Sequence, residues 1–389
     1  MTGTIRADST VPTGRLGALR ELDHPGRVFA HLGPNWFASV MGTGIVANAA
    51  VTLPVGFAGL RAAATVVWAL GALLLLVLTV AWVVHWTRHP DTARGHAHDP
   101  VMAQFWGAPP MALMTVGAGT LLLGEQWIGL GPALAVDWVL WSSGTALGLF
   151  TTAWIPYRMM TTHRLARDSA FGGWLMPVVP PMVSAANGAL LVEHLPAGQP
   201  RLTMLVGCYA MFGISLFATL FVVPQLWHRL VHHKTGSAAS VPTVWIVLGP
   251  LGQSVTAVNL LARPAGSVLP APYGEAADAL GLFYGVCAWG FAVVWLALAA
   301  ALTVRTARVG MPFALTWWSF TFPLGTVVTG TSALATRTHS VLFVVAAVVL
   351  YLGLVLAWTT VAARTARGSY RGGLFEPARG APAGPRVSC

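Results

Sequence analysis

The chain has 389 residues, of which 56% are hydrophobic and only 9% are charged. Soluble domains carry roughly a quarter charged residues, so this chain has too few charges to cover a soluble globule of its size, and lipid must be the solvent for most of it. The net charge of +10 comes from basic residues dispersed between apolar runs. That dispersal argues against nucleic acid as a partner, because a nucleic-acid-binding protein gathers its basic residues on one face.

Ten apolar runs are long enough to cross about 30 Å of hydrocarbon as helices. Charged or turn-forming residues mark their ends, and the runs are 33–53, 62–86, 101–123, 131–157, 173–192, 202–227, 241–261, 276–304, 311–335 and 341–363. We therefore predict an all-α membrane protein with ten transmembrane helices. The predicted transmembrane domain covers residues 31–365. A cytoplasmic segment, residues 1–30, precedes it, and a disordered cytoplasmic tail, residues 366–389, follows it.

The basic residues are divided unequally between the two sides of this topology. With the N-terminus inside, 18 of the 22 Lys and Arg residues fall on the inner side, and the other 4 are Arg61, Arg201, Arg263 and Arg337. An excess of Lys and Arg on the cytoplasmic side is the usual sign of orientation. An odd number of helices would move the later loops across the membrane and remove the asymmetry. The distribution thus predicts an even number of spans, with both termini in the cytoplasm and the chain in a plasma membrane of the bacterial inner-membrane type.

Prolines repeat in the odd-numbered runs, which are also rich in Gly, Ser and Thr. The prolines Pro110, Pro181, Pro250 and Pro323 follow one another at intervals of 71, 69 and 73 residues. A period of two spans predicts five parallel helical hairpins in a quasi-five-fold arrangement. Helices kinked by these prolines are tolerated in a bilayer where they are buried or line a water-filled cavity, so we place the odd helices around a central pore. The alternative is that Pro and Gly serve only tight helix packing.

The acidic residues indicate which ions such a pore would pass. None of the twelve Asp and Glu residues lies inside an odd-numbered run, whereas a cation pathway or a proton relay places carboxylates at the centre of the membrane. We therefore predict an anion pathway. Asp137 and Asp278 fall in even-numbered runs near their outer ends, and we expect them to cap helices or to pair locally.

Hydroxyl and amide side chains of the odd runs are the candidate pore-lining and anion-binding residues: Thr43, Asn48, Thr115, Ser184, Asn187, Gln253, Ser254, Thr321, Thr326 and Thr329. Each could instead form a hydrogen bond within its own helix or to a neighbouring helix. The four outer arginines could form a vestibule that attracts anions or could anchor the helices at the interface.

Phe322 directly precedes Pro323 in the ninth run. A bulky ring at the bend of an inner helix can close a narrow pore by steric occlusion and dewetting, so Phe322 is the candidate gate, with packing as the alternative. The three cysteines lack the spacing of a metal site, and the sequence contains no HExxH or GxSxG motif. We expect no metal, no cofactor and no catalytic residues. An intramembrane enzyme is therefore disfavoured, and a structural or sensor role remains the alternative class.

Two motifs resemble the tellurite-resistance/dicarboxylate transporter family, which includes plant slow-type anion channels, fungal malate permeases and fungal sulfite efflux pumps. They are GPNWFASVMGTGI at 33–45 and WWSFTFPLGT at 317–326. The resemblance covers residues 30–365. It implies ten helices around a central pore, a homotrimer with one pore per subunit, and a phenylalanine gate that corresponds to Phe322. The TFPLG stretch is most similar to the sulfite and plant channel branches. It favours efflux of sulfite or a similar oxyanion over transport of a C4-dicarboxylate such as malate, of tellurite, or of chloride or nitrate.

Overall fold

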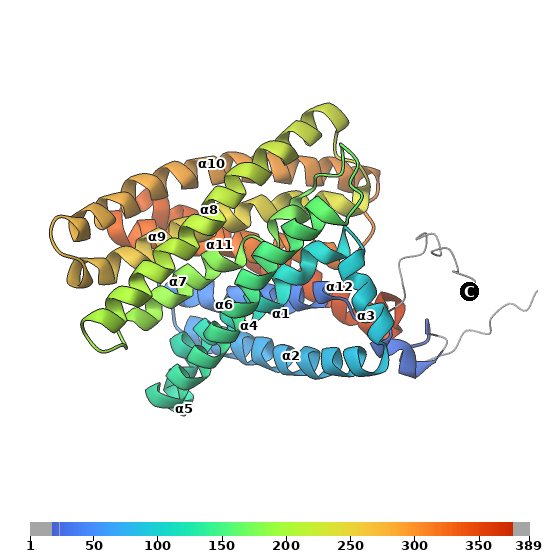
Figure 1. Cartoon of the computed structure of the whole chain (residues 1–389), viewed down its shortest axis with the longest axis horizontal. Helices are drawn as coiled ribbons and strands as arrows, with labels where there is room; N and C mark the ends of the chain where they lie inside the picture. The colour runs from blue at the N-terminus through green and yellow to red at the C-terminus, as the bar shows by residue number, and fades with distance from the viewer. Residues whose placement is uncertain (1–17, 23, 376–389) are drawn as a thin grey trace, which may run out of the picture.

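The computed structural model describes residues 18–22 and 24–375, and every regular element within these residues is a helix. The long helices lie side by side in one bundle (Figure 1). Five of them expose large apolar side chains along much of their length. They are α2 (Leu60–Arg88), α6 (Leu130–Thr161), α8 (Gln199–His233), α10 (Tyr273–Val309) and α12 (Val341–Arg371).

Five shorter α-helices alternate with the long ones along the chain, and most of their residues are buried. They are α1 (Ala38–Thr52), α4 (Ala108–Gly119), α7 (Pro180–Val192), α9 (Leu248–Val268) and α11 (Phe322–Thr338). A 3-10 segment precedes each of them: η2 (Pro34–Phe37), η3 (Met102–Gly107), η5 (Gly172–Leu175), η6 (Ala238–Val247) and η7 (Leu315–Phe320). The remaining elements are α3 (Pro90–His98), α5 (Glu125–Ile128), η1 (Pro25–Phe29), η8 (Gly373–Phe375) and a π-helical turn, η4 (Thr120–Gly124).

Within the described residues, seven helical segments are long and apolar enough to span a membrane: the five long helices, Met102–Ile128 and Ala238–Val268. The segments predicted as first, fifth and ninth spans contain shorter α-helices. Their lengths are 15 residues in α1, 13 in α7 and 17 in α11. In each of these three segments a 3-10 segment precedes the α-helix, and in the fifth and ninth a turn separates the two.

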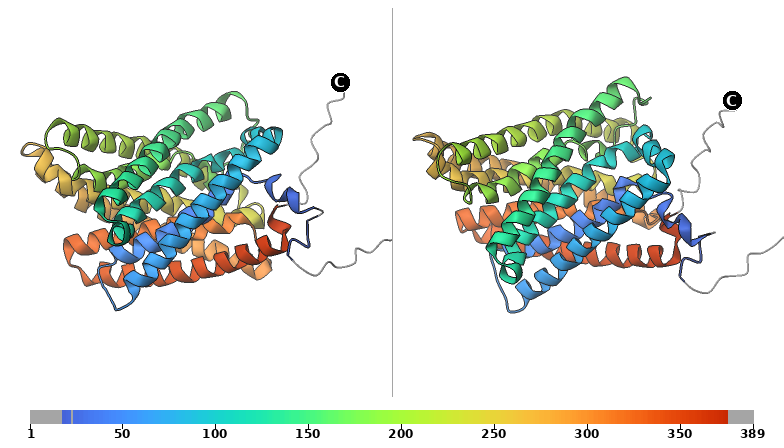
Figure 2. Two further views of the ribbon diagram at one scale, coloured as in Figure 1. Left: turned by 90° about the horizontal axis from the view of Figure 1, so that it is seen from below. Right: turned by 60° about the horizontal axis from the view of Figure 1, so that its bottom comes forward.

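The five buried helices form a closed ring. In the ring, α1 contacts α4, α4 contacts α7, α7 contacts α9, α9 contacts α11, and α11 contacts α1. Each long helix covers the ring from outside: α2 packs on α1, α6 on α4 and α7, α8 on α7 and α9, α10 on α9 and α11, and α12 on α11 and α1. Figure 2 shows α2 and α12 along the outside of the bundle. The polar and broken segments are thereby enclosed by apolar helices.

The close approach of α9 and α11 depends on glycine residues in both helices. A Cβ atom added to Gly252 of α9 would collide with the backbone nitrogen of Val327 in α11, and one added to Gly330 would lie 2.9 Å from the carbonyl oxygen of Gly252. In this contact the Thr326 hydroxyl donates a hydrogen bond to the Leu248 carbonyl oxygen at 3.1 Å. Small residues that let helix backbones approach are a general feature of membrane helix pairs.

The four repeated prolines lie near the start of α-helices and not in their middle. Pro110, Pro181 and Pro323 are in the first turns of α4, α7 and α11, and Pro250 is the third residue of α9. Proline is favoured in the first turn because the missing N–H would have no intrahelical partner there. The repeat therefore marks where the 3-10 or irregular backbone changes to α-helix, and this change of backbone takes the place of the predicted mid-helix kinks.

The two described ends of the chain meet at one end of the bundle. The backbone N–H of Leu19 donates to the carbonyl oxygen of Tyr370 at 2.7 Å, and the rings of Trp36 and Phe375 stack at 5.1 Å. The helix α12 continues to Arg371, so residues 366–371 of the predicted tail are helical. Residues 376–389 of that tail, and residues 1–17 of the predicted N-terminal segment, lie outside the described residues.

A histidine stack joins three segments at this end. His85 of α2 lies 2.7 Å, by its Nδ1 atom, from the carbonyl oxygen of Phe29 in η1, and its ring stacks on that of His96 in α3 at 5.2 Å. Burial, and to a smaller extent the neighbouring His85 and His31, lower the pKa of His96 to about 4, and Asp99 partly opposes them. The stack therefore packs best with a neutral His96.

We expect Gly252→Ala to lower stability, because the added methyl group would push α9 away from α11. Overpacking of this kind costs about 1–3 kcal/mol. The matched control is Gly249→Ala in the same helix, where a Cβ would have no heavy atom within 4 Å; it should be neutral or stabilising by about 0.5–1 kcal/mol, the usual gain of Ala over Gly in a helix. Thermal unfolding in detergent measures both. Equal midpoints for the two variants would contradict the close contact.

Acidification should destabilise the histidine stack. The folded protein binds a proton at His96 only near pH 4, whereas the unfolded chain binds it near the ordinary pKa of 6.5. The free energy of unfolding therefore falls as the pH is lowered from about 6.5 to about 4. His96→Gln should make the unfolding midpoint less dependent on pH across this window, and His98→Gln, an exposed change in the same helix, should not. Parallel pH profiles for His96→Gln and the unsubstituted protein would refute the prediction.

Candidate permeation pathway

Two cavities lie along the axis of the ring, one beyond the other. The wide cavity has a volume of about 400 Å³ and the narrow one about 20 Å³. All five ring helices, or the segments that lead into them, contribute to both. In α1 the narrow cavity is lined by Met41 and the wide one by Asn48; in α11 the pair is Phe322 and Thr329. Seven residues correspond to two helical turns, or about 10 Å, so the cavities are successive layers of one passage.

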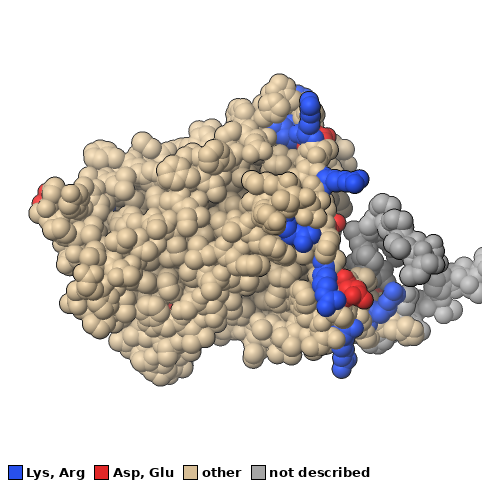
Figure 3. Space-filling view, in the orientation of Figure 1, with Lys and Arg blue, Asp and Glu red and all other residues tan. Residues whose placement is uncertain are grey.

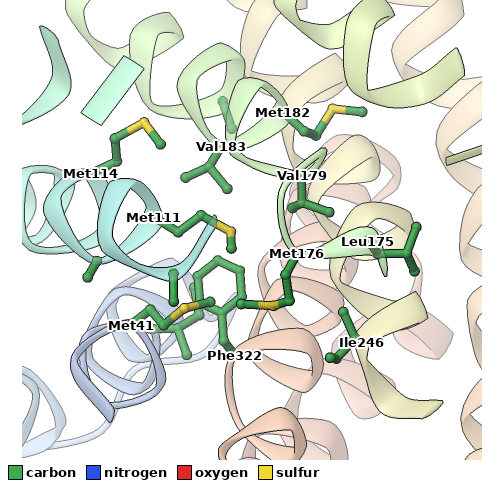
Figure 4. Packing of buried hydrophobic residues seen from close by; sticks show 14 of the residues in the cluster. Met41, Met111, Met114, Leu175, Met176, Val179, Met182, Val183, Ile246 and Phe322 are labelled. Carbon is green, nitrogen blue, oxygen red and sulfur yellow. The ribbon is translucent and has the colours of Figure 1, made fainter. Parts of the chain in front are cut away.

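Phe322 lies in the narrow layer. Its side chain is 3% exposed. Met41 of α1, Met111 of α4 and Met176, before α7, surround the ring, as Figure 4 shows. Val179 and Ile246 complete much of the surrounding wall. Because these side chains are apolar and fill nearly all the space, the narrow layer is a hydrophobic constriction, and such constrictions exclude water and ions.

The wide layer is polar. Asn48 donates a hydrogen bond through its amide nitrogen to the carbonyl oxygen of Thr115 at 3.0 Å, and Asn187 donates to that of Met114 at 2.9 Å. Each amide thus retains a second N–H. The amide of Gln253 lines the same cavity and has no hydrogen-bond partner among the described residues. These N–H groups are neutral donors that can replace part of the hydration of an anion.

Of the ten candidate pore-lining residues, the structure brings Asn48, Asn187, Gln253 and Thr329 together around the wide cavity. The other six form hydrogen bonds within their own helix or to a neighbouring helix. Their partners are the Trp358 indole for Thr43, and the carbonyl oxygens of Met111 for Thr115, Pro180 for Ser184, Leu251 for Ser254, Trp318 for Thr321 and Leu248 for Thr326.

Some residues of this passage were not among the candidates. Thr256 lines the wide cavity, and its hydroxyl lies 2.7 Å from that of Thr329. Gln253, Thr256, Leu260 and Arg263 all line the cavity from α9, and their spacing of three and four residues is that of one helix face. This periodicity could have identified Thr256 once Gln253 was chosen. Methionines of the constriction carry no comparable signal, since Met is common in any apolar core.

The structure does not bring the four outer arginines together around the wide cavity. Arg61 donates to the carbonyl oxygen of Leu122 at 2.9 Å, and Arg201 donates to that of Leu195 at 2.7 Å. Arg337 forms an ion pair with Asp278. Only Arg263, of these four, lines the wide cavity. Leu122 lies in the π-helical turn η4, and Leu195 lies in the turn after α7, so both arginines bind backbone carbonyl oxygens where the chain departs from regular α-helix.

The two acidic residues of the even-numbered runs differ in environment. Asp278 pairs locally with Arg337, as predicted. The same prediction was wrong for Asp137, which is 0% exposed and has no hydrogen-bond partner for either carboxyl oxygen among the described residues. Its carboxyl group packs against Gly117 of α4, where the missing side chain leaves room for it. Neither Asp137 nor any other acidic residue lines the two cavities.

Backbone polarity also favours negative charge in this passage. An irregular turn separates η5 from α7, and Thr321 separates η7 from α11. The helices α7 and α11 therefore begin inside the bundle, beside the constriction that Val179 and Phe322 line. A helix carries partial positive charge at its N-terminus, and broken membrane helices use such ends to stabilise anions. Among the described residues, no group of His, Cys, Asp and Glu could hold a metal ion.

Comparison with known proteins gives one family and several relatives. The family model described as voltage-dependent anion channel matches residues 31–366. A sulfite efflux pump of Trichophyton rubrum is 28% identical over 350 residues, which cover 88% of this chain and 92% of the relative. An uncharacterized transporter of Methanocaldococcus jannaschii is 29% identical, with 76% and 81% covered. The malic acid transport protein of Schizosaccharomyces pombe is 22% identical, with 75% and 68% covered.

Proposed function

The chain belongs to the voltage-dependent anion channel family, and within that family of membrane anion transporters we propose that it exports sulfite or a similar small oxyanion through the passage enclosed by the ring helices. The observation that carries the proposal is the pair of stacked cavities: a wide layer of neutral N–H and hydroxyl donors, followed by an apolar constriction at Phe322. With no carboxylate in either layer, an anion meets no fixed negative charge.

We propose that the passage is the pore of a ten-helix domain, residues 31–365, built as five parallel hairpins in quasi-five-fold arrangement. The ring contacts support this arrangement, since each ring helix is followed in the chain by a long helix that packs on it. The short helices α1, α7 and α11 would cross the bilayer together with the segments before them. We further propose a homotrimer with one pore per subunit.

The proposed orientation places both termini in the cytoplasm of a bacterial-type inner membrane. On the face drawn in Figure 3, Lys and Arg side chains gather at the end of the molecule where the described chain ends meet. Such an excess is typical of the cytoplasmic side. In this orientation the constriction lies nearer the cytoplasm, and the wide cavity opens toward the outside.

Sulfite is the favoured substrate because relatives named as sulfite efflux pumps match over most of their length. The relatives named for malic acid are more distant, at 22% and 20% identity. A C4-dicarboxylate such as malate is therefore the second candidate. Tellurite, chloride and nitrate remain further alternatives, as does a structural or sensor role without transport.

The proposal is tested by a flux panel in proteoliposomes that compares sulfite, malate, tellurite, chloride and nitrate at equal gradients. We expect the sulfite flux to exceed the malate flux. A malate flux faster than the sulfite flux would make malate the favoured substrate and sulfite the second candidate. If chloride or nitrate crossed fastest, the protein would be a general anion channel. If none of the five anions crossed faster than in empty liposomes, the transport function would be refuted and a structural or sensor role favoured.

Phe322→Ala should increase the anion flux, because removing the ring opens the constriction between Met41, Met111 and Met176. We expect a rise of about tenfold or more, the effect of lowering a barrier by about 1.4 kcal/mol. Phe320→Ala is the matched control: Phe320 is also buried, but it packs on Trp245 and Trp317 away from the narrow cavity. Unchanged flux in Phe322→Ala, or an equal rise in Phe320→Ala, would remove the assignment of Phe322 as gate.

Gln253→Glu should reduce the anion flux more than Gln253→Leu. Both changes remove the free amide donor from the wide cavity, but only Glu adds a negative charge that repels the permeant in a site of low dielectric constant. The two variants therefore separate charge from hydrogen bonding. An increase of anion flux in Gln253→Glu would contradict the passage of anions through this cavity.

A further inference from the structure

A basic cleft lies outside the passage, at the end of the bundle where α12 terminates. It has a volume of about 540 Å³ and is lined by Arg364, Arg367 and Arg371 of α12, with Glu21, Phe313 and Leu374 among the other walls. The arginine spacing of three and four residues places the side chains on one helix face. No residue of this cleft lines either cavity of the passage.

The position along α12 places the cleft at the membrane surface. The helix begins at Val341, and at 1.5 Å per residue Arg364 lies about 35 Å further along it. The hydrocarbon core is about 30 Å thick, so the last two turns of α12 reach the layer of lipid headgroups or the water beyond it.

The three guanidinium groups are unpaired within the described residues. None of them forms a hydrogen bond or an ion pair there, unlike Arg61, Arg201 and Arg337. Arg364 is held over the ring of Trp317, 4.8 Å from its centroid, a cation–π contact that keeps the group in place. One carboxylate, that of Glu21, lines the same cleft, so the cleft retains an excess of positive charge.

The residues outside the described part of the chain carry no net negative charge. Residues 376–389 contain one Glu and two Arg, residues 1–17 contain one Asp and two Arg, and residue 23 is an Asp. A group that balances the three arginines is therefore best supplied from outside the chain. We propose that the cleft binds a phosphate group, carried either by an anionic phospholipid or by a soluble phosphate compound. The planar guanidinium fork matches phosphate oxygens in pairs, and basic pockets at the surface of membrane proteins recognise lipid headgroups in this way.

The cleft is connected to the constriction by a short chain of contacts. Trp317, under Arg364, is followed by Trp318, which lines the narrow cavity beside Phe322. The indole N–H of Trp318 donates to the hydroxyl of Thr365 at 3.1 Å, and Thr365 follows Arg364 in α12. A phosphate group that fixes Arg364 thus also fixes η7, the segment that leads into Phe322. We therefore expect phosphate binding to change the anion flux. This effect on flux rests on the proposed function, but the binding of phosphate does not.

The binding experiment compares two double variants that each remove two positive charges. Arg367→Gln with Arg371→Gln alters the cleft and leaves the contact between Arg364 and Trp317 intact. Arg305→Gln with Arg308→Gln alters the last turns of α10 and serves as the control. Delipidated protein is titrated with phosphatidylglycerol, and the bound fraction is measured by native mass spectrometry. We expect roughly tenfold to thirtyfold weaker binding in the cleft variant, since each basic residue near the surface contributes separately, and a change within about twofold in the control.

Competition identifies the source of the phosphate group. If glycerol phosphate or inorganic phosphate displaces phosphatidylglycerol at low concentration, the site takes a soluble phosphate; if neither displaces it, the site takes a lipid. Equal losses in the two double variants would show a general charge effect and overturn the proposal, as would unchanged binding in the cleft variant. Sulfite flux measured in vesicles with and without phosphatidylglycerol then tests the link to the gate. Failure of transport alone leaves the binding result standing.

Discussion

The inner helices can interrupt their regular backbone only because the outer helices keep lipid away from them. In hydrocarbon an unsatisfied N–H or carbonyl group costs several kcal/mol, so a segment such as η5, the following turn and α7 could not face the bilayer. Here α6 and α8 pack on α7, and the Ser215 hydroxyl of α8 accepts the backbone N–H of Met182 at 2.9 Å. The collar thus permits the changes of backbone, and the changes of backbone allow α7 and α11 to begin inside the bundle.

The proposed passage combines two kinds of surface. Apolar side chains around Phe322 line its narrow layer and would exclude water without a charged barrier, whereas the amides of Asn48, Asn187 and Gln253 offer donors in the wide layer without fixing a charge. A fixed cation deep in the passage would hold an anion strongly and slow its release, because conduction needs binding weak enough to reverse. The one arginine in the wide layer, Arg263, is exposed, where solvent weakens its field.

The sequence predicted the helices well where one strong signal sufficed. Long apolar runs correspond to α2, α6, α8, α10 and α12. The repeated prolines, predicted as mid-helix kinks, lie instead near the starts of α4, α7, α9 and α11. Which polar side chains of an inner helix line the cavity could not be predicted, because a helix buried on all sides does not separate a polar face from an apolar one. In α1, Thr43 contacts Trp358 of α12, whereas Asn48 lines the cavity. The contacts of Arg61 and Asp137 could not be predicted, because their surroundings, the Leu122 carbonyl and Gly117, come from other helices.

The spacing of seven residues between the two layers affects how such proteins can diversify. Met41 and Asn48, or Phe322 and Thr329, occupy the same helix face two turns apart, so no side chain belongs to both layers. A substitution that reshapes the polar layer for a larger or more highly charged solute leaves the closing layer intact, and the reverse also holds. Under the proposed function, separate mutations can therefore adjust substrate choice and leak, so that one scaffold can acquire new solutes and still close.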